Sequence, residues 1–409
     1  MTDAPVRIER LATGGDGVGR LEDGRTLFVP RSAPGDLIEI SSLRLHKRFA
    51  RGRIGRLVEA GAGRVTPLCA HYERDHCGGC QLQHLDTERQ VAAKQSIIGE
   101  ALRRLGKLEV ADPVVEPAIK PFGYRTKVTL TRGPGGVFGF HREGESEKVF
   151  GLERCELMAP ALQAGWAKLR PLLRSIPADA ERLVLRLDRT GGVHLVIATI
   201  GQRSWPAEPL AVVGTVWWHP SAGAPRVIAG GDARTAYPAT IFEQVNPVMG
   251  DRVRAFAVEQ AGVVKGMHCW DLYAGIGETT DLLLAGGATV ESVEGDKRAV
   301  EVAERRTPGS KGALRGARRF AGLVEEVIPT LRPAELVITN PPRVGMAPVA
   351  VDHLAAMRPK KLIYISCDPA TLARDVARLG TGWRVTTVRG FDLFPQTAHV
   401  ETVLVLERA

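Results

Sequence analysis

The chain has 409 residues, of which 44% are apolar and 25% are charged, a composition typical of soluble globular proteins and unlike that of disordered or fibrous ones. At roughly 150 residues per domain, this length predicts two or three domains. The apolar runs are far shorter than the roughly 18 residues that cross a bilayer, which excludes a membrane-spanning segment. The first residues lack the apolar core of a secretion signal, so we expect a cytoplasmic protein with reduced thiols.

Positive charge is concentrated near the N-terminus. The chain carries 55 Lys and Arg against 46 Asp and Glu, a net charge of +9. Between residues 44 and 64 a single acid, Glu59, accompanies seven basic residues, here called the basic run: Arg44, Lys47, Arg48, Arg51, Arg53, Arg56 and Arg64. Such an excess attracts a polyanion by releasing its counterions, which predicts binding of RNA or DNA. The alternative is a solvated basic surface.

Residues 1–60 are predicted to form a small antiparallel β-barrel. Short apolar pieces, such as those at 27–29 and 37–40, alternate with polar residues and are separated by glycine-containing turns. This pattern is typical of short strands, and roughly fifty residues suffice for five of them. Small barrels often bind nucleic acid, in agreement with the basic run.

The rest of the chain has two different patterns. Residues 61–236 form a β-rich region, with a helix expected over 87–105 and strands over 126–131, 137–141, 183–187 and 193–200. From 237 to 409, apolar strands alternate with amphipathic helices. The strands are expected at 269–273, 289–294, 336–339, 362–367 and 400–406, and the helices near 278–286, 297–306 and 370–379. This alternation predicts a doubly wound, mostly parallel sheet, and hence a multidomain α/β protein.

Three of the six cysteines cluster in the β-rich region. Cys69, Cys77 and Cys80 form the pattern C-x7-C-x2-C, and Cys155 is the nearest remaining cysteine. Three clustered ligands and one remote ligand favour a 4Fe-4S cluster, because zinc sites usually pair two short C-x-x-C hooks. Zinc and unliganded thiols remain alternatives. Three histidines close in sequence keep zinc open: His71, His76 and His84.

A glycine-containing loop opens the C-terminal half. The strand at 269–273 ends in Gly275 and Gly277, and Thr280 stands where a dinucleotide-binding motif has its third glycine. The pyrophosphate cradle is therefore incomplete. Glu294 closes the next strand, where it can accept hydrogen bonds from ribose hydroxyls. A nucleoside without a pyrophosphate suits this set, and S-adenosylmethionine is the commonest such cofactor on this topology.

Two further strand ends carry chemistry. Asn340, followed by two prolines, ends a strand at the same sheet edge and resembles loops of enzymes that methylate exocyclic amines. Cys367 ends another strand there, beside a helix whose dipole favours a thiolate. Glu401 begins the terminal strand and is a candidate base. An inert core cysteine and a solvated glutamate are the plain alternatives.

Together these motifs resemble the RNA 5-methyluridine methyltransferases, in the branch with an N-terminal TRAM barrel and an iron-sulfur cluster that modifies ribosomal RNA. The resemblance covers nearly the whole chain. It rests on CGGCQLQHL (77–85), FGFHREGESEKVFGLERCELMAP (138–160), FEQVNP (242–247), DLYAGIGETT (271–280), NPPR (340–343), SCDPATLARD (366–375) and FPQTAHVET (394–402).

The resemblance implies three domains: an RNA-binding TRAM barrel at 1–60, a central iron-sulfur domain at 61–236 and a methyltransferase domain at 237–409. It also implies a role for each candidate residue. The expected 4Fe-4S ligands are Cys69, Cys77, Cys80 and Cys155. The expected S-adenosylmethionine contacts are Gln244, Tyr273, Glu278, Glu294 and Asn340. Phe242 would stack on the target base, Cys367 would be the nucleophile and Glu401 the base. RNA, most often 23S rRNA, is the expected substrate, and we expect a monomer.

The chain departs from the family pattern at three places. Asn340 stands where the family usually has Asp, Gln396 replaces a histidine near the base, and C-x7-C replaces C-x5-C. Two other functions remain open: an amino methyltransferase that uses the Asn-Pro-Pro loop and needs no nucleophile, and a non-catalytic RNA-binding protein. The presence of both Cys367 and Glu401 argues against them, because C5 methylation of uracil needs a thiolate at C6 and a base for the C5 proton.

Overall fold

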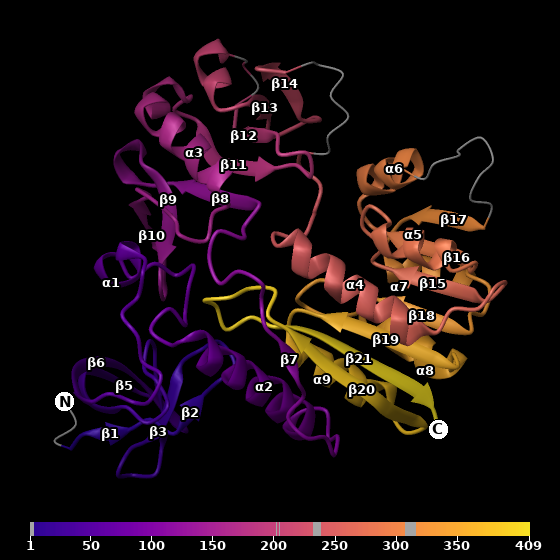
Figure 1. Cartoon of the computed structure of the whole chain (residues 1–409), viewed down its shortest axis with the longest axis horizontal. Coiled ribbons are helices and arrows are strands. Elements are labelled where there is room, and N and C mark those ends of the chain that lie inside the picture. Colours follow the sequence, from indigo (N-terminus) through magenta and orange to yellow (C-terminus); the bar gives the residue numbers. More distant parts are fainter. Residues whose placement is uncertain (1–3, 202, 204, 232–238, 307–315) are drawn as a thin grey trace.

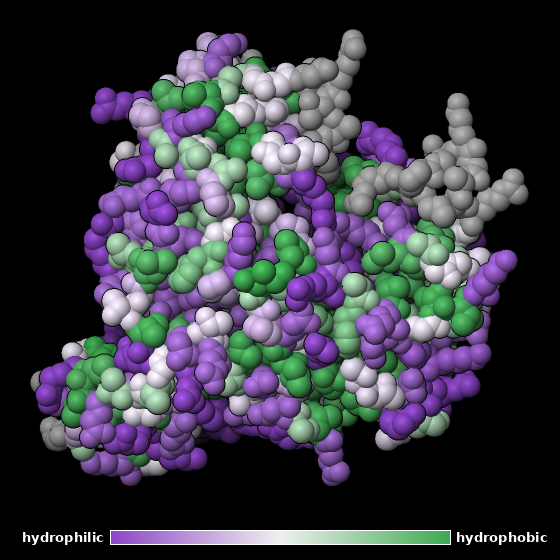
Figure 2. All heavy atoms as spheres, viewed as in Figure 1, coloured by the Kyte–Doolittle hydropathy of each residue, from purple (hydrophilic) through white to green (hydrophobic). Residues whose placement is uncertain are grey.

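Three β-sheets organise the molecule (Figure 1), and they follow one another along the chain except for one short edge strand of the third sheet. The computed structural model describes residues 4–201, 203, 205–231, 239–306 and 316–409. The boundary expected between residues 236 and 237 lies outside these ranges. On the face drawn in Figure 2, apolar residues are dispersed among hydrophilic ones. Within the described ranges, no helix has both the length and the apolar character needed to cross a membrane.

The N-terminal sheet has six strands in the order β1-β5-β6-β4-β3-β2, one more than expected. The strands are β1 (Val6–Arg7), β2 (Arg10–Leu11), β3 (Gly17–Arg20), β4 (Thr26–Val29), β5 (Leu37–Leu45) and β6 (Phe49–Glu59). Strands β4 and β6 pair in parallel, so the sheet is not antiparallel throughout, contrary to the prediction from the pattern. Ile8, Leu27 and Ile38 are fully or almost fully buried in its core, as the period-two pattern requires.

The central sheet contains seven strands in the order β10-β9-β8-β11-β12-β13-β14. They are β8 (Lys127–Arg132), β9 (Phe138–Arg142), β10 (Glu145–Gly151), β11 (Ala180–Leu187), β12 (Val193–Thr199), β13 (Thr215–His219) and β14 (Arg226–Ala229). The four strands predicted in this region are present. Helix α3 (Pro160–Leu169) covers one face and buries Trp166 and Leu169 against it. The short α1 (Ala70–Arg74) lies before this sheet in the chain.

The C-terminal sheet has the order β17-β16-β15-β18-β19-β21-β20-β7. Its strands are β15 (His268–Leu272), β16 (Thr289–Glu294), β17 (Ala317–Ala321), β18 (Leu336–Thr339), β19 (Lys361–Ser366), β20 (Trp383–Phe391) and β21 (Glu401–Arg408), with β7 (Val115–Glu116) at the edge. The five strands from β17 to β19 are parallel, and β21 is antiparallel to both its neighbours. The chain order reverses between β15 and β18, the point at which such sheets bind ligands.

Helices flank this sheet on both faces (Figure 1). They are α4 (Pro247–Ala261), α5 (Glu278–Ala285), α6 (Lys297–Arg306), α7 (Val324–Val327), α8 (Pro348–Met357) and α9 (Pro369–Leu379). The sheet carries two apolar cores, one with Trp270, Leu362 and Leu404 fully buried and the other with Cys269 and Ile363 fully buried. Buried strands of this kind follow from the long apolar runs read in the sequence.

Helix α2 (Thr87–Arg104) and β7 pack on the C-terminal sheet, although the sequence places them in the central domain. Ile98 and Leu102 of α2 are fully buried in the same core as Leu372 of α9. Strand β7 extends the sheet by pairing in parallel with β20, Val115 opposite Gly390. The apolar face of α2 has no partner in the central sheet, so its burial fixes the segment beside α9.

Candidate active site and cysteine pocket

The carboxyl ends of β15, β18 and β19 bring the predicted site residues to one edge of the sheet. The backbone N–H of Asn340 donates to the carbonyl of Leu272 at 3.1 Å, which fixes the end of β18 against β15. Tyr273 adopts a left-handed backbone conformation (φ 61°) at the start of the glycine loop. Burial raises the pKa of the Tyr273 hydroxyl to about 12, so it stays neutral. The strand ends therefore meet as the parallel topology predicts.

Glu294 supports the glycine loop directly. One of its carboxylate oxygens accepts from the N–H of Gly275 at 2.8 Å, and the other accepts from the N–H of Asp296 at 2.8 Å. Each oxygen keeps further acceptor capacity, so the same carboxylate can still bind ribose hydroxyls. Gly277 also has a left-handed conformation (φ 80°), and a Cβ there would lie 2.8 Å from Nη1 of Arg319. The loop thus needs glycine for space as well as for conformation.

Glu278, at the start of α5, is held by arginines that the sequence did not single out. Arg189, from the turn between β11 and β12, donates to Oε1 of Glu278 at 2.6 Å. Arg254 of α4 lies 3.1 Å from Oε2, and both arginines also pair with Asp251. This network ties the central domain to the loop expected to bind the cofactor. Gln244 lies next to Gly250 at the start of α4.

Cys367 directly follows the last residue of β19, and Glu401 is the first residue of the neighbouring strand β21. Ser366, the last residue of β19, pairs with Thr402 of β21, so the next positions in antiparallel register are Cys367 and Glu401. Glu401 is 2% exposed, and its Oε2 has no hydrogen-bond partner. The structure thus brings together two candidate residues that are 34 positions apart in the sequence. From the sequence, the predicted strands were the only reason to place both at one sheet edge.

The electrostatics of this pair suit a base better than a preformed thiolate. Burial raises the pKa of Glu401 to about 7. Burial, followed by the Glu401 charge, raises the pKa of the Cys367 thiol to about 11, although Arg343 acts in the opposite direction. The Asp368 side chain, directly after Cys367, accepts from the first N–H groups of α9, those of Ala370 and Thr371. The effect expected of the α9 dipole on the Cys367 thiol stays a prediction.

Two other predicted positions differ in their surroundings. Phe242 is 65% exposed, so its ring is available to a ligand. Gln396 is buried and turned toward α2, where its Oε1 accepts from Nε2 of Gln90 at 3.0 Å. The backbone N–H of Gln396 donates to Oε1 of Gln90 at 2.9 Å. This residue therefore fixes the loop between β20 and β21 to α2.

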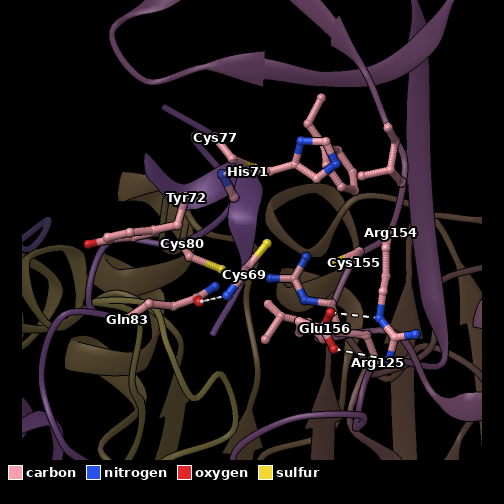
Figure 3. Close-up of a pocket in the computed structure, with 14 residues that line it drawn as sticks. Cys69, His71, Tyr72, Cys77, Cys80, Gln83, Arg125, Arg154, Cys155 and Glu156 are labelled. Atoms are coloured by element: carbon pink, nitrogen blue, oxygen red, sulfur yellow. Dashed lines mark hydrogen bonds and ion pairs between the residues drawn. The ribbon is translucent and has the colours of Figure 1, made fainter. Parts of the chain in front are cut away.

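Cys69, Cys77, Cys80 and Cys155 line one cavity of about 80 Å³, which Figure 3 shows between α1, the Cys77–Cys80 turn and the segment after β10. Aromatic and aliphatic side chains such as Phe140 and Leu157, together with polar and charged ones such as His71 and Arg125, line the rest. Burial raises the pKa values of the Cys77 and Cys80 thiols to about 12. The two other cysteines, Cys269 and Cys367, belong to the C-terminal domain.

The cavity has one feature that suits an anionic group. Arg125 lines it, and its buried Nε has no hydrogen-bond partner. A buried cation with an unused donor favours an anion. Over the part of the chain that is described, no three His, Cys, Asp or Glu side chains are arranged to hold a metal ion. The 4Fe-4S cluster stays a prediction.

Known proteins with similar sequences agree with this arrangement. The profile of the tRNA (Uracil-5-)-methyltransferase family matches residues 296–409, and that of the TRAM domain matches residues 4–54. An uncharacterised RNA methyltransferase of Gloeobacter violaceus is 34% identical over 99% of this chain and 96% of its own length. The 23S rRNA (uracil(1939)-C(5))-methyltransferase RlmD of Nitrosospira multiformis is 31% identical over 99% of both chains. The chain belongs to the RNA (uracil-5-)-methyltransferase family.

The fold of this methyltransferase also matches a solved structure over its whole length. The tRNA (uracil-54, C5)-methyltransferase of Pyrococcus abyssi, solved with S-adenosyl-L-homocysteine, aligns with a TM-score of 0.75 at 23% identity, covering 99% of this chain and 100% of that one. The TRAM expectation for the N-terminal barrel is confirmed by the domain match. The enzyme class predicted from the motifs, an RNA uracil-C5 methyltransferase dependent on S-adenosylmethionine, is likewise confirmed.

Proposed function

We propose that this methyltransferase acts on one uridine of 23S ribosomal RNA through a covalent bond between Cys367 and C6 of the uracil. The observation that carries the proposal is the register of β19 and β21, which continues from the Ser366–Thr402 pair to Cys367 opposite Glu401, at the sheet edge that also holds the glycine loop. A nucleophile and an unpartnered buried carboxylate in this arrangement suit an addition–elimination reaction. An amino methyltransferase needs neither group.

The residues divide the chemistry as follows. S-adenosylmethionine supplies the methyl group as an electrophile. The sulfur of Cys367 adds to C6 of uracil, its thiol proton having left to solvent, and the electrons of the C5–C6 double bond move to make C5 nucleophilic. After methylation at C5, the carboxylate of Glu401 removes the C5 proton, the double bond re-forms and the C6–S bond breaks. A pKa of about 7 lets Glu401 take and release this proton near neutral pH.

Cofactor binding is assigned to the sheet edge and to α4. Glu294 would hold the ribose hydroxyls, while Tyr273, Glu278, Gln244 and Asn340 would contact the remainder of the cofactor. The support is the rigidity of the loop, since Glu294 accepts from Gly275, and Glu278 is held by two arginines. Asn340 offers a neutral amide where the family usually has a carboxylate.

The cysteine pocket is assigned a 4Fe-4S cluster. Four thiols from two segments would be its ligands, and the cluster would supply a covalent link between these segments. Arg125 supports the assignment, because its unpartnered Nε can donate to a sulfur of an anionic cluster.

Ribosomal RNA is proposed because relatives that cover the whole chain are named 23S rRNA methyltransferases. The basic run would bind phosphates, and exposed Phe242 would stack on the target base once it leaves its neighbours. We expect the enzyme to act as a monomer in the cytoplasm.

Mass spectrometry of nucleosides tests the proposed function. Purified 23S rRNA and transfer RNA from cells that lack the protein are each incubated with the enzyme and S-adenosylmethionine. We expect one new 5-methyluridine per 23S rRNA and none in transfer RNA. A methylated adenine or guanine would instead support the amino methyltransferase, and 5-methyluridine in transfer RNA alone would reassign the substrate.

A further inference from the structure

A rigid turn projects from the sheet edge beside Cys367. It comprises residues 342–345 and follows Asn340 and Pro341 after β18. The N–H of Gly345 donates to the carbonyl of Pro342 at 2.8 Å, and Gly345 has a left-handed φ of 84°. A Cβ on Gly345 would lie 2.4 Å from Nη2 of Arg374 and 2.5 Å from Oδ2 of Asp375. Glycine is therefore required at this position by both conformation and space.

Buried groups fix the turn from below. Oδ2 of Asp375, a residue 2% exposed, accepts from the N–H of Met346 at 2.8 Å and from the hydroxyl of Tyr364 at 2.6 Å. Nη2 of Arg374 donates to the carbonyl of Val344 at 2.7 Å. A buried carboxylate with several donors holds its partners firmly. These contacts fix the backbone of the turn at Val344, Gly345 and Met346.

The tip presents two side chains to solvent. Val344 is 73% exposed, the highest value among the large apolar residues in the described ranges. The Arg343 side chain is 64% exposed, and its Nε lies 3.6 Å from Oδ2 of Asp368, the residue after Cys367. An ion pair at this distance with a largely exposed guanidinium contributes little to stability, so Arg343 can exchange partners readily. An isolated exposed valine is ordinary, but one on a fixed turn beside a nucleophile has a defined position.

We propose that the 342–345 turn contacts the RNA at the target nucleotide, with Arg343 binding its phosphate and Val344 filling the place that the target base leaves in the stack. This inference rests on the proposed function, because it takes a flipped uridine as the ligand of Cys367. A stacked base reaches the partly buried Cys367 only after it leaves the stack, which costs free energy. An apolar wedge on a rigid support offsets part of this cost, as it does in proteins that open nucleic-acid stacks.

Charge around the nucleophile favours this assignment of Arg343. Glu401 and Asp368 both act to raise the pKa of the Cys367 thiol, and Arg343 is the group that acts to lower it. A polyanion approaching two carboxylates needs a cation at the point of contact, and a guanidinium binds phosphate oxygens in bidentate geometry. Phe242, 65% exposed, would then stack on the flipped base while Val344 occupies the gap.

The test compares two variants of the turn with two matched controls. Arg343→Gln and Val344→Ser change only exposed side chains. The first control, Arg378→Gln on α9, removes an exposed arginine that pairs with Asp352 at 2.7 Å. The second control, Val349→Ser on α8, removes a valine that is 59% exposed. RNA binding is measured with S-adenosyl-L-homocysteine present, so that no turnover occurs. Base opening is followed by the fluorescence of 2-aminopurine beside the target uridine.

We expect Arg343→Gln to weaken RNA binding about tenfold and to lower the slope of log affinity against log salt by about 0.7, the value of one phosphate contact on a single strand. It should also move the pH profile of adduct formation to higher pH. Val344→Ser should reduce the 2-aminopurine signal and raise the KM for RNA several-fold with the KM for S-adenosylmethionine unchanged. Both controls should match the wild type.

Wild-type affinity, salt slope and 2-aminopurine signal in both turn variants would overturn the inference. So would an equal loss in the control variants, since that would reflect general surface charge or apolarity. Failure of the proposed function has a different signature: the wild-type enzyme would then form no 5-methyluridine and no adduct, whatever residues occupy the turn.

Discussion

The buried carboxyl of Glu401 should make the folding stability of the enzyme depend on pH. Its carboxyl is buried, with one oxygen unpartnered, and its pKa is raised by burial from 4.5 to about 7. The folded state therefore binds the proton more tightly than the unfolded state does. The stabilisation from the protonated carboxyl is fully present below pH 4.5 and is lost as the pH rises through 7. Glu401→Gln, which is neutral at every pH, should remove this dependence.

The size of the effect follows from the shift. One pKa unit corresponds to 1.36 kcal/mol, and integrating the two titration curves between pH 5 and pH 8 gives a loss of about 2.5 kcal/mol in the wild type alone. The free energy of unfolding of Glu401→Gln, relative to wild type, should rise by this amount over that range. The variant should therefore be the more stable protein at pH 8, where the wild-type carboxylate is buried and charged.

Hydrogen exchange of the β21 amides measures this difference locally, because that strand lies at the centre of the C-terminal core. Glu335→Gln is the matched control. Lys360 holds the pKa of the Glu335 carboxyl below its usual range, so the group is ionised throughout pH 5–8 and the effect of its removal should not vary. A Glu401→Gln effect that is constant from pH 5 to pH 8 would refute the reasoning, since Glu401 would then have no raised pKa.

Three further predictions concern other parts of the molecule. Anaerobically purified protein should absorb at ~400 nm and carry about four irons per chain. The variant Cys155→Ser should lose the absorbance and the iron, whereas the control Cys269→Ser should retain both. Stoichiometric zinc in a colourless sample would contradict the cluster assignment. Lys94 and Asp392 form a fully buried ion pair. Lys94→Ala leaves Asp392 without its ion-pair partner and should therefore lower the free energy of unfolding of the C-terminal domain by about 3–5 kcal/mol. A loss below ~1 kcal/mol in thermal unfolding would contradict this. Neutralising four residues of the basic run, Arg44, Lys47, Arg48 and Arg51, should raise the KM for RNA and leave kcat nearly unchanged. Normal RNA binding by this variant at about 150 mM salt would show that the basic run is only a solvated surface.

The sequence predicted the parts of the structure that depend on local patterns. Apolar runs and their spacing indicated the strands that Tyr273, Asn340 and Cys367 directly follow, and the parallel topology then placed these strand ends together. Glu401 begins β21 as predicted. Local patterns were sufficient to predict these strands, because the burial and the ends of a strand depend on a few neighbouring residues.

Such local patterns could not predict contacts between side chains that are far apart in the sequence. Gln90 and Gln396 are 306 positions apart, and neither residue's neighbours indicate that their amides meet. The same holds for Arg189 and Glu278, which join two domains. The helix-dipole expectation for Cys367 stays a prediction. The residue that follows Cys367, Asp368, caps α9 with its side chain, as an aspartate at the start of a helix often does.

Trapping on RNA that contains 5-fluorouridine tests the covalent mechanism most directly. Fluorine at C5 cannot be removed as a proton, so after methyl transfer the C6–S bond cannot break by elimination and the adduct should persist. We predict a band of protein joined to RNA on denaturing gels that requires S-adenosylmethionine, is absent in Cys367→Ala and maps by mass spectrometry to the peptide that contains Cys367. Methylation of uridine by Cys367→Ala, or a trapped adduct on another residue, would contradict the mechanism.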